Sequence, residues 1–176
     1  MIDSLCRFLA PSALLLWAVY PLALCAAPRP FTVAPKVADQ QNLLEPDQVR
    51  LTGFLGRRIM ANEKNRLLVV DEDRLLISYR NRPGVHQWDG EHVGKWLHAA
   101  TLAWVNTGDA AAMAACVRIA DLLARTFGEQ PGQLNLVLSG SHAGMAASSV
   151  LEPMVWMYRL TGEARYLEFC QMVLRR

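Results

Sequence analysis

WDGEHVGKWLHAATLAWVNTGD, residues 88–109, is the most informative stretch of this chain. Asp89 predicts the N-cap of a helix over residues 91–106, because its short side chain can accept hydrogen bonds from unpaired backbone N–H groups. Apolar side chains recur along that helix at the i, i+3, i+4, i+7 and i+11 spacing of a buried face: Val93, Trp96, Leu97, Ala100 and Trp104. Gly108 predicts a left-handed residue that ends the helix. The stretch therefore predicts a buried helix followed by a tight turn.

The Thr-Gly-Asp turn that ends this stretch has a counterpart, Thr-Gly-Glu, at residues 161–163. Alignment of the two turns pairs Trp104 with Tyr158 and Cys116 with Cys170. Each half is then a helix, a turn and a helix, with the further helices expected over residues 110–126, within 145–160 and over 164–175. An αα-hairpin cannot bury its apolar face alone, so the halves must pack together. The repeat is too long for a short solenoid repeat and predicts an all-α toroid of helical hairpins.

Before residue 88 the pattern is less regular. A helix is expected over residues 54–68, with Glu63 on its polar side. The apolar side of that helix is expected to be buried: Leu55, Ile59 and Leu67. Asp73 predicts the cap of a short turn that ends at Leu76. Residues 49–51 predict a short strand.

The N-terminus predicts export. Residues 1–27 resemble a signal peptide, with Arg7 before an apolar run over 8–24 and small residues after it. Cleavage after Cys25 would put small side chains at the two positions that need them. A lipoprotein modified at Cys25 is less favoured because bulky Leu24 precedes it, and an uncleaved anchor is less favoured because the run is short for the roughly 20 residues of a spanning helix. The mature protein is expected to be secreted or periplasmic, without stable membrane insertion.

Residues 28–48 are rich in proline and predict an extended linker, and residues 49–176 predict the folded domain. A formal net charge of +2, with scattered basic residues, argues against a nucleic-acid partner. Cys116 and Cys170 fall on apolar helix faces, where buried free thiols are a simpler interpretation than a disulfide. No Cys/His ligand spacing predicts a metal site in this chain.

Candidate binding residues gather at the start of the helix over residues 91–106. Trp88, Asp89, Glu91 and His92 combine an indole, two carboxyl groups and an imidazole. Such a mixture suits a sugar, because polar groups can bind its hydroxyls while an aromatic ring covers its C–H face. In a toroid, the starts of the inner helices line the central funnel. The sequence therefore predicts a carbohydrate ligand at these residues.

A second candidate, His142, lies in the loop SGSHAGM, residues 139–145, before the next helix. Backbone N–H groups and the imidazole could face a ligand there. Structural roles compete with binding at all of these positions. Glu91 can complement the helix dipole and pair with Lys95 at i+4, Asp89 can serve as a cap alone, and His142 can belong to a surface loop.

Three segments carry a family resemblance: VRLTGFLGRRIMANEKNRLLVVDEDRLLISYR (residues 49–80), YRNRPGVHQWDGEHVGKWLHAATLAWVNTGD (79–109) and GSHAGMAASSVLEPMVWMYRLTGEARYLEFC (140–170). They resemble the β-L-arabinofuranosidase family, glycoside hydrolase family 127 and its relatives. The resemblance implies an (α/α)6 toroid that acts on L-arabinofuranosyl or related plant-glycan sugars. It also implies a zinc-bound cysteine nucleophile and a glutamate acid/base, which lie in a later region of the family. This chain ends before that region, at Arg176.

These implications set the expectations for the chain. It should hold an incomplete toroid with part of a sugar-binding funnel, no catalytic zinc centre and no glycosidase activity. Relatives carry more sequence between the first hairpin and the GSHAGM-like segment, so residues 110–130 suggest the hypothesis that a hairpin has been lost by deletion. A non-catalytic αα-hairpin module that binds carbohydrate or protein is the alternative. A fragment without a stable fold is a third possibility.

Overall fold

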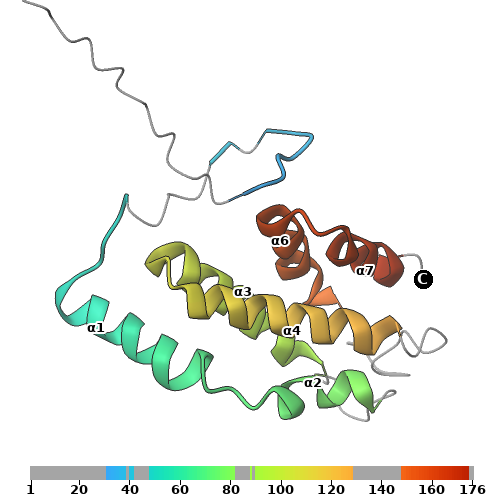
Figure 1. The fold of residues 1–176 in the computed structure, drawn as a ribbon, viewed down its shortest axis with the longest axis horizontal. Coiled ribbons are helices and arrows are strands. Elements are labelled where there is room, and N and C mark those ends of the chain that lie inside the picture. The colour runs from blue at the N-terminus through green and yellow to red at the C-terminus, as the bar shows by residue number, and fades with distance from the viewer. Residues whose placement is uncertain are drawn as a thin grey trace, which may run out of the picture.

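The protein is described here from a computed structural model, which describes residues 31–38, 40–41, 48–81, 88, 90–128 and 148–174. Within these ranges the backbone is helical and contains no strand (Figure 1). The helices are α1 (Gly53–Asn62), the π-helix η1 (Glu63–Leu67), α2 (Glu72–Arg80), α3 (Glu91–Thr107), α4 (Ala110–Gly128), α6 (Leu151–Thr161) and α7 (Ala164–Leu174). The predicted all-α class is confirmed, whereas the strand predicted over residues 49–51 is wrong. The predicted signal peptide, Asp89 and His142 lie outside the described residues.

No helix among the described ranges combines the length and apolar character that crossing a membrane requires.

Two αα-hairpins form the body of the fold. Helices α3 and α4 make the first hairpin, and α6 and α7 make the second. The hairpins lie side by side, with α3 against α6 and α4 against α7 (Figure 1). Pro153 lies in the first turn of α6, where a missing backbone N–H costs little. This arrangement is that of neighbouring hairpins in an incomplete helical toroid.

The two predicted turns have the same geometry. Gly108 and Gly162 are both left-handed, with φ of 68° and 79°. In each turn the preceding threonine donates a hydrogen bond to the carbonyl four residues earlier, at 2.9 Å for Thr107 and 2.7 Å for Thr161. Each threonine oxygen also accepts from the backbone N–H of the acidic residue that follows the glycine, at 3.3 Å and 3.2 Å. The sequence repeat is therefore a structural repeat down to its hydrogen bonds.

The core lies between the two hairpins and extends beneath α2 and η1. Its largest fully buried side chains include Tyr79, Tyr166, Phe169, Leu97, Ile119, Leu123, Met154 and Met157. Cys116 and Cys170 are buried free thiols, as the simpler interpretation predicted. Long helices α3 and α4 bury most of the stripes that their apolar spacing predicts.

Two burial predictions are wrong, those for Leu55 and Glu63. Leu55 is 60% exposed, and Phe169, for which no prediction was made, is in the core. Glu63, placed on the polar side of its helix, is completely buried. Glu63 is buried against the first hairpin turn, where its Oε1 lies 3.3 Å from Thr107 Oγ1. A π-turn begins at Glu63, because the hydrogen bond from Leu68 N–H to the Glu63 carbonyl (2.9 Å) spans five residues instead of four. This wider turn shifts the side chains after Glu63 out of the 3.6-residue phase on which the prediction rested.

Two helix starts also differ from their predictions. Asp71, and not Asp73, caps α2: its carboxylate accepts a hydrogen bond from the Arg74 N–H at 3.0 Å. Helix α2 then continues to Arg80, well beyond the short turn that the sequence predicted. At α3 the N-cap position belongs to Gly90, whose φ of 87° turns the chain into the helix. The sequence pattern had predicted Asp89 at that position.

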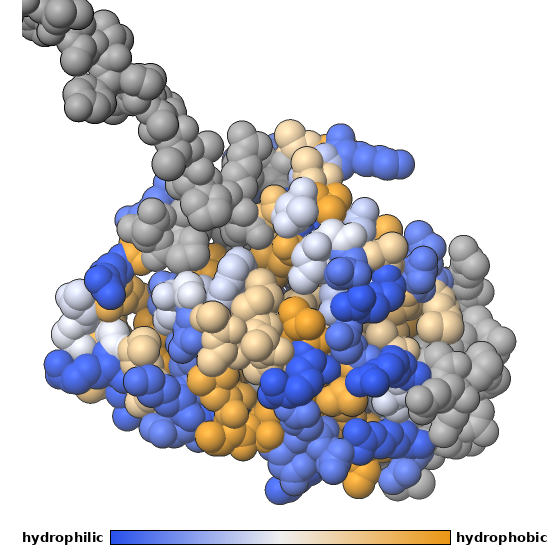
Figure 2. All heavy atoms as spheres, in the orientation of Figure 1, coloured by the Kyte–Doolittle hydropathy of each residue, from blue (hydrophilic) through white to orange (hydrophobic). Residues whose placement is uncertain are grey.

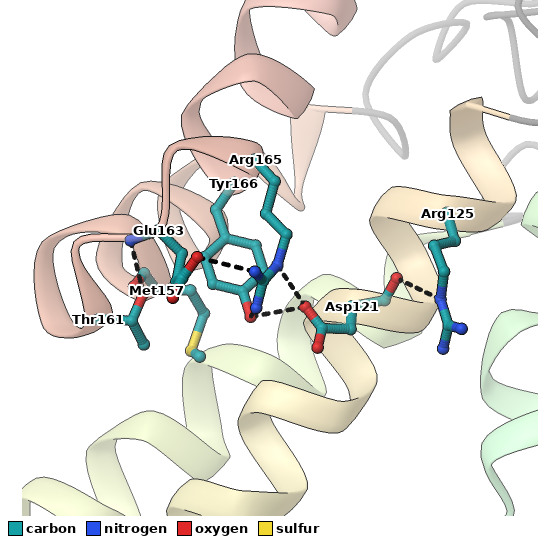
Figure 3. A network of polar contacts seen from close by, with 7 residues as sticks. All are labelled: Asp121, Arg125, Met157, Thr161, Glu163, Arg165 and Tyr166. Carbon is teal, nitrogen blue, oxygen red and sulfur yellow. Dashed lines mark hydrogen bonds and ion pairs between the residues drawn. The ribbon is translucent and has the colours of Figure 1, made fainter.

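A polar network joins the outer helices α4 and α7 (Figure 3). Asp121 accepts hydrogen bonds from the Arg165 guanidinium at 2.7 Å and from the Tyr166 hydroxyl at 2.8 Å. Arg165 also pairs with Glu163, at 2.8 Å, in the turn that precedes α7. Burial, followed by the hydrogen bond with Asp121, raises the pKa of Tyr166 to about 12. The network therefore ties the second hairpin to the first through a neutral, buried tyrosine.

Part of the segment predicted as a linker lies against the second hairpin. Thr32 Oγ1 donates to the Leu160 carbonyl at 2.8 Å, and Val33 N–H donates to the Arg159 carbonyl at 2.9 Å. The Arg159 guanidinium lies 3.9 Å from the centre of the Phe31 ring. These contacts fix residues 31–33 on the C-terminal end of α6.

Apolar side chains also reach the surface, where they lie among polar ones (Figure 2). Several of the most exposed belong to α1 and its flanks, including Leu51, Phe54 and Leu55. Helix α1 buries none of its own residues. It is thus the least integrated helix of the described fold.

Candidate functional site

The candidate site lies at the start of α3. The left-handed Gly90 reverses the chain there, and the Glu91 N–H donates a hydrogen bond to the Trp88 carbonyl at 3.2 Å. This local turn holds Trp88 beside the first turn of α3, which presents Glu91 and His92. All three residues line one cleft of about 530 Å³ between α2 and α3. The full lining is Arg74, Leu75, Ile77, Ser78, Trp88, Gly90, Glu91, His92 and Lys95.

The structure thus brings together Trp88, Glu91 and His92 among the residues predicted to bind a sugar. The other two predicted residues, Asp89 and His142, lie outside the described ranges. His98, one and a half turns further along α3, packs on Trp156 with ring centres 5.2 Å apart. It is an interhelical histidine and does not line the cleft.

The α2 wall of the cleft is the part that sequence reasoning missed. Arg74 and Ser78 stand four residues apart and therefore share a face of α2. Their spacing was visible in the sequence, but the predicted turn ended at Leu76. Recognition of Asp71 as the cap would have extended the helix and placed both side chains on one surface.

One ion pair lies along α3, in the wall of the cleft. Glu91 Oε1 lies 2.8 Å from Lys95 Nζ, which confirms the predicted i, i+4 pair. The Glu91 side chain is 19% exposed, whereas that of Lys95 is 65% exposed. The ion-pairing role and the cleft-lining role of Glu91 therefore coexist, because the same carboxylate that pairs with Lys95 also forms the wall.

The start of α6 lies beside the start of α3. A Cβ atom on Gly94 would stand 2.3 Å from the Ser149 carbonyl oxygen, so the two backbones approach more closely than any side chain allows. Ser149 Oγ also donates to the Glu91 carbonyl at 3.4 Å. The starts of α3 and α6, the first helices of the two hairpins, thus meet at the end of the molecule that holds the cleft. This is the placement expected for helices that line a toroid funnel.

The described residues do not fit the zinc-bound cysteine that the family resemblance implies. Burial raises the pKa of Cys116 to about 12 and that of Cys170 to about 11, so both remain thiols at neutral pH. Within the described ranges, no group of three or more His, Cys, Asp and Glu side chains is placed to hold a metal ion. The cleft also contains one described carboxylate, Glu91. The described lining offers a ligand hydrogen-bonding groups, charges and an aromatic side chain.

The family was tested by comparison with known proteins. Residues 52–176 match the model of the family described as β-L-arabinofuranosidase, GH127 catalytic domain. The comparisons with curated proteins and with solved structures found no match. The matched range includes α1, η1 and both hairpins, and it contains every described residue that lines the cleft. The chain therefore belongs to the β-L-arabinofuranosidase GH127 catalytic-domain family.

Proposed function

We propose that the cleft between α2 and α3 is a sugar-binding part of a glycoside hydrolase that acts on L-arabinofuranosyl or related plant-glycan residues. Family membership supports the general class of function. The observation that carries the proposal is the convergence of Trp88, Glu91 and His92 with Ser78 around one cleft. An indole, a hydroxyl, an imidazole and a carboxylate around one cleft offer a saccharide both polar groups and an aromatic surface.

Each of these groups has a distinct role in the proposal. Trp88 offers an aromatic surface to the C–H side of a sugar ring, where burial from water drives association. His92 and Ser78 can both donate and accept hydrogen bonds, so they can match sugar hydroxyls. In its ionised form Glu91 accepts hydrogen bonds and donates none, and its partner Lys95 keeps it in place. Recognition thus depends on side chains that α2 and the start of α3 hold on opposite walls of the cleft.

Substitutions in the cleft test this role. In calorimetric titrations of the full chain with arabino-oligosaccharides, Trp88→Ala and His92→Ala are each expected to weaken binding by about tenfold, the effect of losing one good contact. His98→Ala is the matched control, because that histidine lies on the same helix but packs on Trp156. Equal affinities for the wild-type chain and both cleft variants would reject the proposed site.

We further propose that the 176-residue chain does not hydrolyse glycosides. Hydrolysis requires two catalytic carboxyl groups, or an equivalent nucleophile, on opposite sides of the bond. The described part of the cleft supplies Glu91, and this carboxylate is engaged with Lys95. Incubation of the purified chain with a chromogenic aryl β-L-arabinofuranoside, with and without added zinc, is expected to release no phenol above the blank. Turnover that rises with protein concentration would contradict the proposal.

A further inference from the structure

The charges around the cleft are uneven. Its described lining contains the cations Arg74 and Lys95 and one carboxylate, Glu91. Glu91 and Lys95 form an ion pair with each other at 2.8 Å. The guanidinium of Arg74 on the opposite wall is therefore the charge that remains to be explained.

The carboxylates near Arg74 are engaged elsewhere. Asp71 caps α2 by accepting the backbone N–H of Arg74 and not its side chain. Glu72 pairs with Arg118 at 2.6 Å, and Asp73 pairs with Arg80 at 2.7 Å. Among the described residues Arg74 forms no ion pair. The carboxylates at the start of α2 thus bind other groups, and the guanidinium of Arg74 lines the cleft.

A guanidinium is suited to one kind of ligand group. Its planar set of N–H donors matches a carboxylate in a two-point hydrogen-bonded pair, and it remains charged at every physiological pH. A neutral sugar offers this guanidinium only hydroxyl oxygens as acceptors, whereas a sugar that bears a carboxylate also offers it an opposite charge.

We propose that the cleft prefers acidic saccharides, in which a uronic-acid carboxylate binds Arg74 while the sugar ring lies against the Trp88 side of the cleft. This inference rests on the proposed sugar-binding function and deepens it by naming the class of ligand. It assigns to α2 the selection of charge and to the start of α3 the recognition of the sugar.

The test compares an acidic saccharide with its neutral ester and with a neutral arabinose oligomer. The full chain is titrated with trigalacturonate, with its methyl-esterified neutral counterpart and with arabinotriose. Trigalacturonate is expected to bind about tenfold more tightly than its ester, and the difference should shrink as salt increases, because salt screens exposed charges. Arg74→Gln should remove the preference, so that the variant binds trigalacturonate and the ester with equal affinity. Arg66→Gln, which removes an exposed cation outside the cleft lining, should retain the preference.

The outcomes separate this inference from the function on which it rests. Equal binding of the acid and the ester, with no effect of Arg74→Gln, would overturn the acidic preference and leave sugar binding intact. Failure to bind any of the three saccharides would overturn both. Tighter binding of a sulfated trisaccharide than of trigalacturonate would also overturn the carboxylate assignment, because the cleft would then select a sulfate.

Discussion

Gly94→Ala is expected to destabilise the protein by about 3 kcal/mol, although alanine is the better helix former. Intrinsic helix propensity alone predicts the opposite sign, a gain of about 1 kcal/mol in the middle of a helix. The steric cost prevails because an added Cβ would lie 2.3 Å from the Ser149 carbonyl oxygen and 2.6 Å from its carbonyl carbon. These are backbone atoms at the start of α6, so the whole second hairpin would have to shift away from α3. Chemical denaturation followed by circular dichroism measures the change.

Ala99→Gly provides the matched control for this prediction. Ala99 is an exposed residue of the same helix, so the reverse exchange tests propensity without a steric term. It should cost about 1 kcal/mol. A Gly94→Ala variant as stable as the wild type would show that the starts of α3 and α6 do not approach as closely as described. Loss of saccharide binding together with stability would agree with a cleft whose geometry depends on that contact.

The hairpin architecture could be predicted from the sequence because it follows from local rules. A long helix repeats its apolar spacing several times, so a single exception, such as the half-buried Trp104, does not obscure the face of α3. The two Thr-Gly-acid turns are equally local, since each glycine adopts a left-handed conformation that other residues disfavour. Trp88, Glu91 and His92 were identified for the same reason: all three lie within five residues at one helix start.

The rest depended on contacts between distant residues. The second wall of the cleft comes from α2, and no local pattern links Arg74 to His92. The buried Glu63 contacts Thr107, which is 44 residues away in the sequence, and no apolar periodicity reveals such a contact. Short elements are also poorly marked: α2 has nine residues, and its start was misassigned by two positions.

The buried carboxyl group of Glu63 has few hydrogen-bond partners. Its Oε1 lies 3.3 Å from Thr107 Oγ1, while its Oε2 has no partner among the described residues. Thr107 has one hydroxyl proton, and its shorter contact, 2.9 Å, is with the Ala103 carbonyl. Thr161, in the equivalent turn, uses its proton on the matching carbonyl of Met157. Thr107 therefore shares its one proton between the Ala103 carbonyl and Glu63 Oε1, and a protonated Glu63 can donate to Thr107 Oγ1 in return.

The surroundings of Glu63 favour that protonated form. Burial raises the pKa of Glu63 above its ordinary value of 4.5, and the nearby Asp109 carboxylate raises it further. The hydrogen bond from Thr107 and the charge of Lys64 oppose the shift. Burial and Asp109 outweigh them, so the folded protein binds the Glu63 proton more tightly than the unfolded chain does.

A raised pKa in the folded state fixes the sign of the pH dependence. Because the folded protein holds this proton more tightly than the unfolded chain, the stabilising contribution is complete below pH 4.5 and is lost as pH rises through the folded pKa. Glu63→Gln removes this loss, since a glutamine amide can donate to Thr107 at any pH. The variant should match the wild type near pH 4 and exceed its free energy of unfolding by about 1 kcal/mol at pH 7. Denaturation curves across that range measure both values.

The second hairpin turn, residues 161–163, supplies an internal control. Thr161→Val removes the hydroxyl that bonds the Met157 carbonyl and the Glu163 N–H, and it should cost about 1 kcal/mol at every pH. Thr107→Val removes the equivalent bonds and also the acceptor of the Glu63 proton. Its cost should therefore exceed that of Thr161→Val at pH 4, and the excess should shrink as Glu63 ionises. Equal costs for the two valine variants at pH 4, or a Glu63→Gln variant less stable than the wild type at pH 7, would contradict a protonated Glu63, because either result requires the carboxylate to be stable in its charged form beneath the turn.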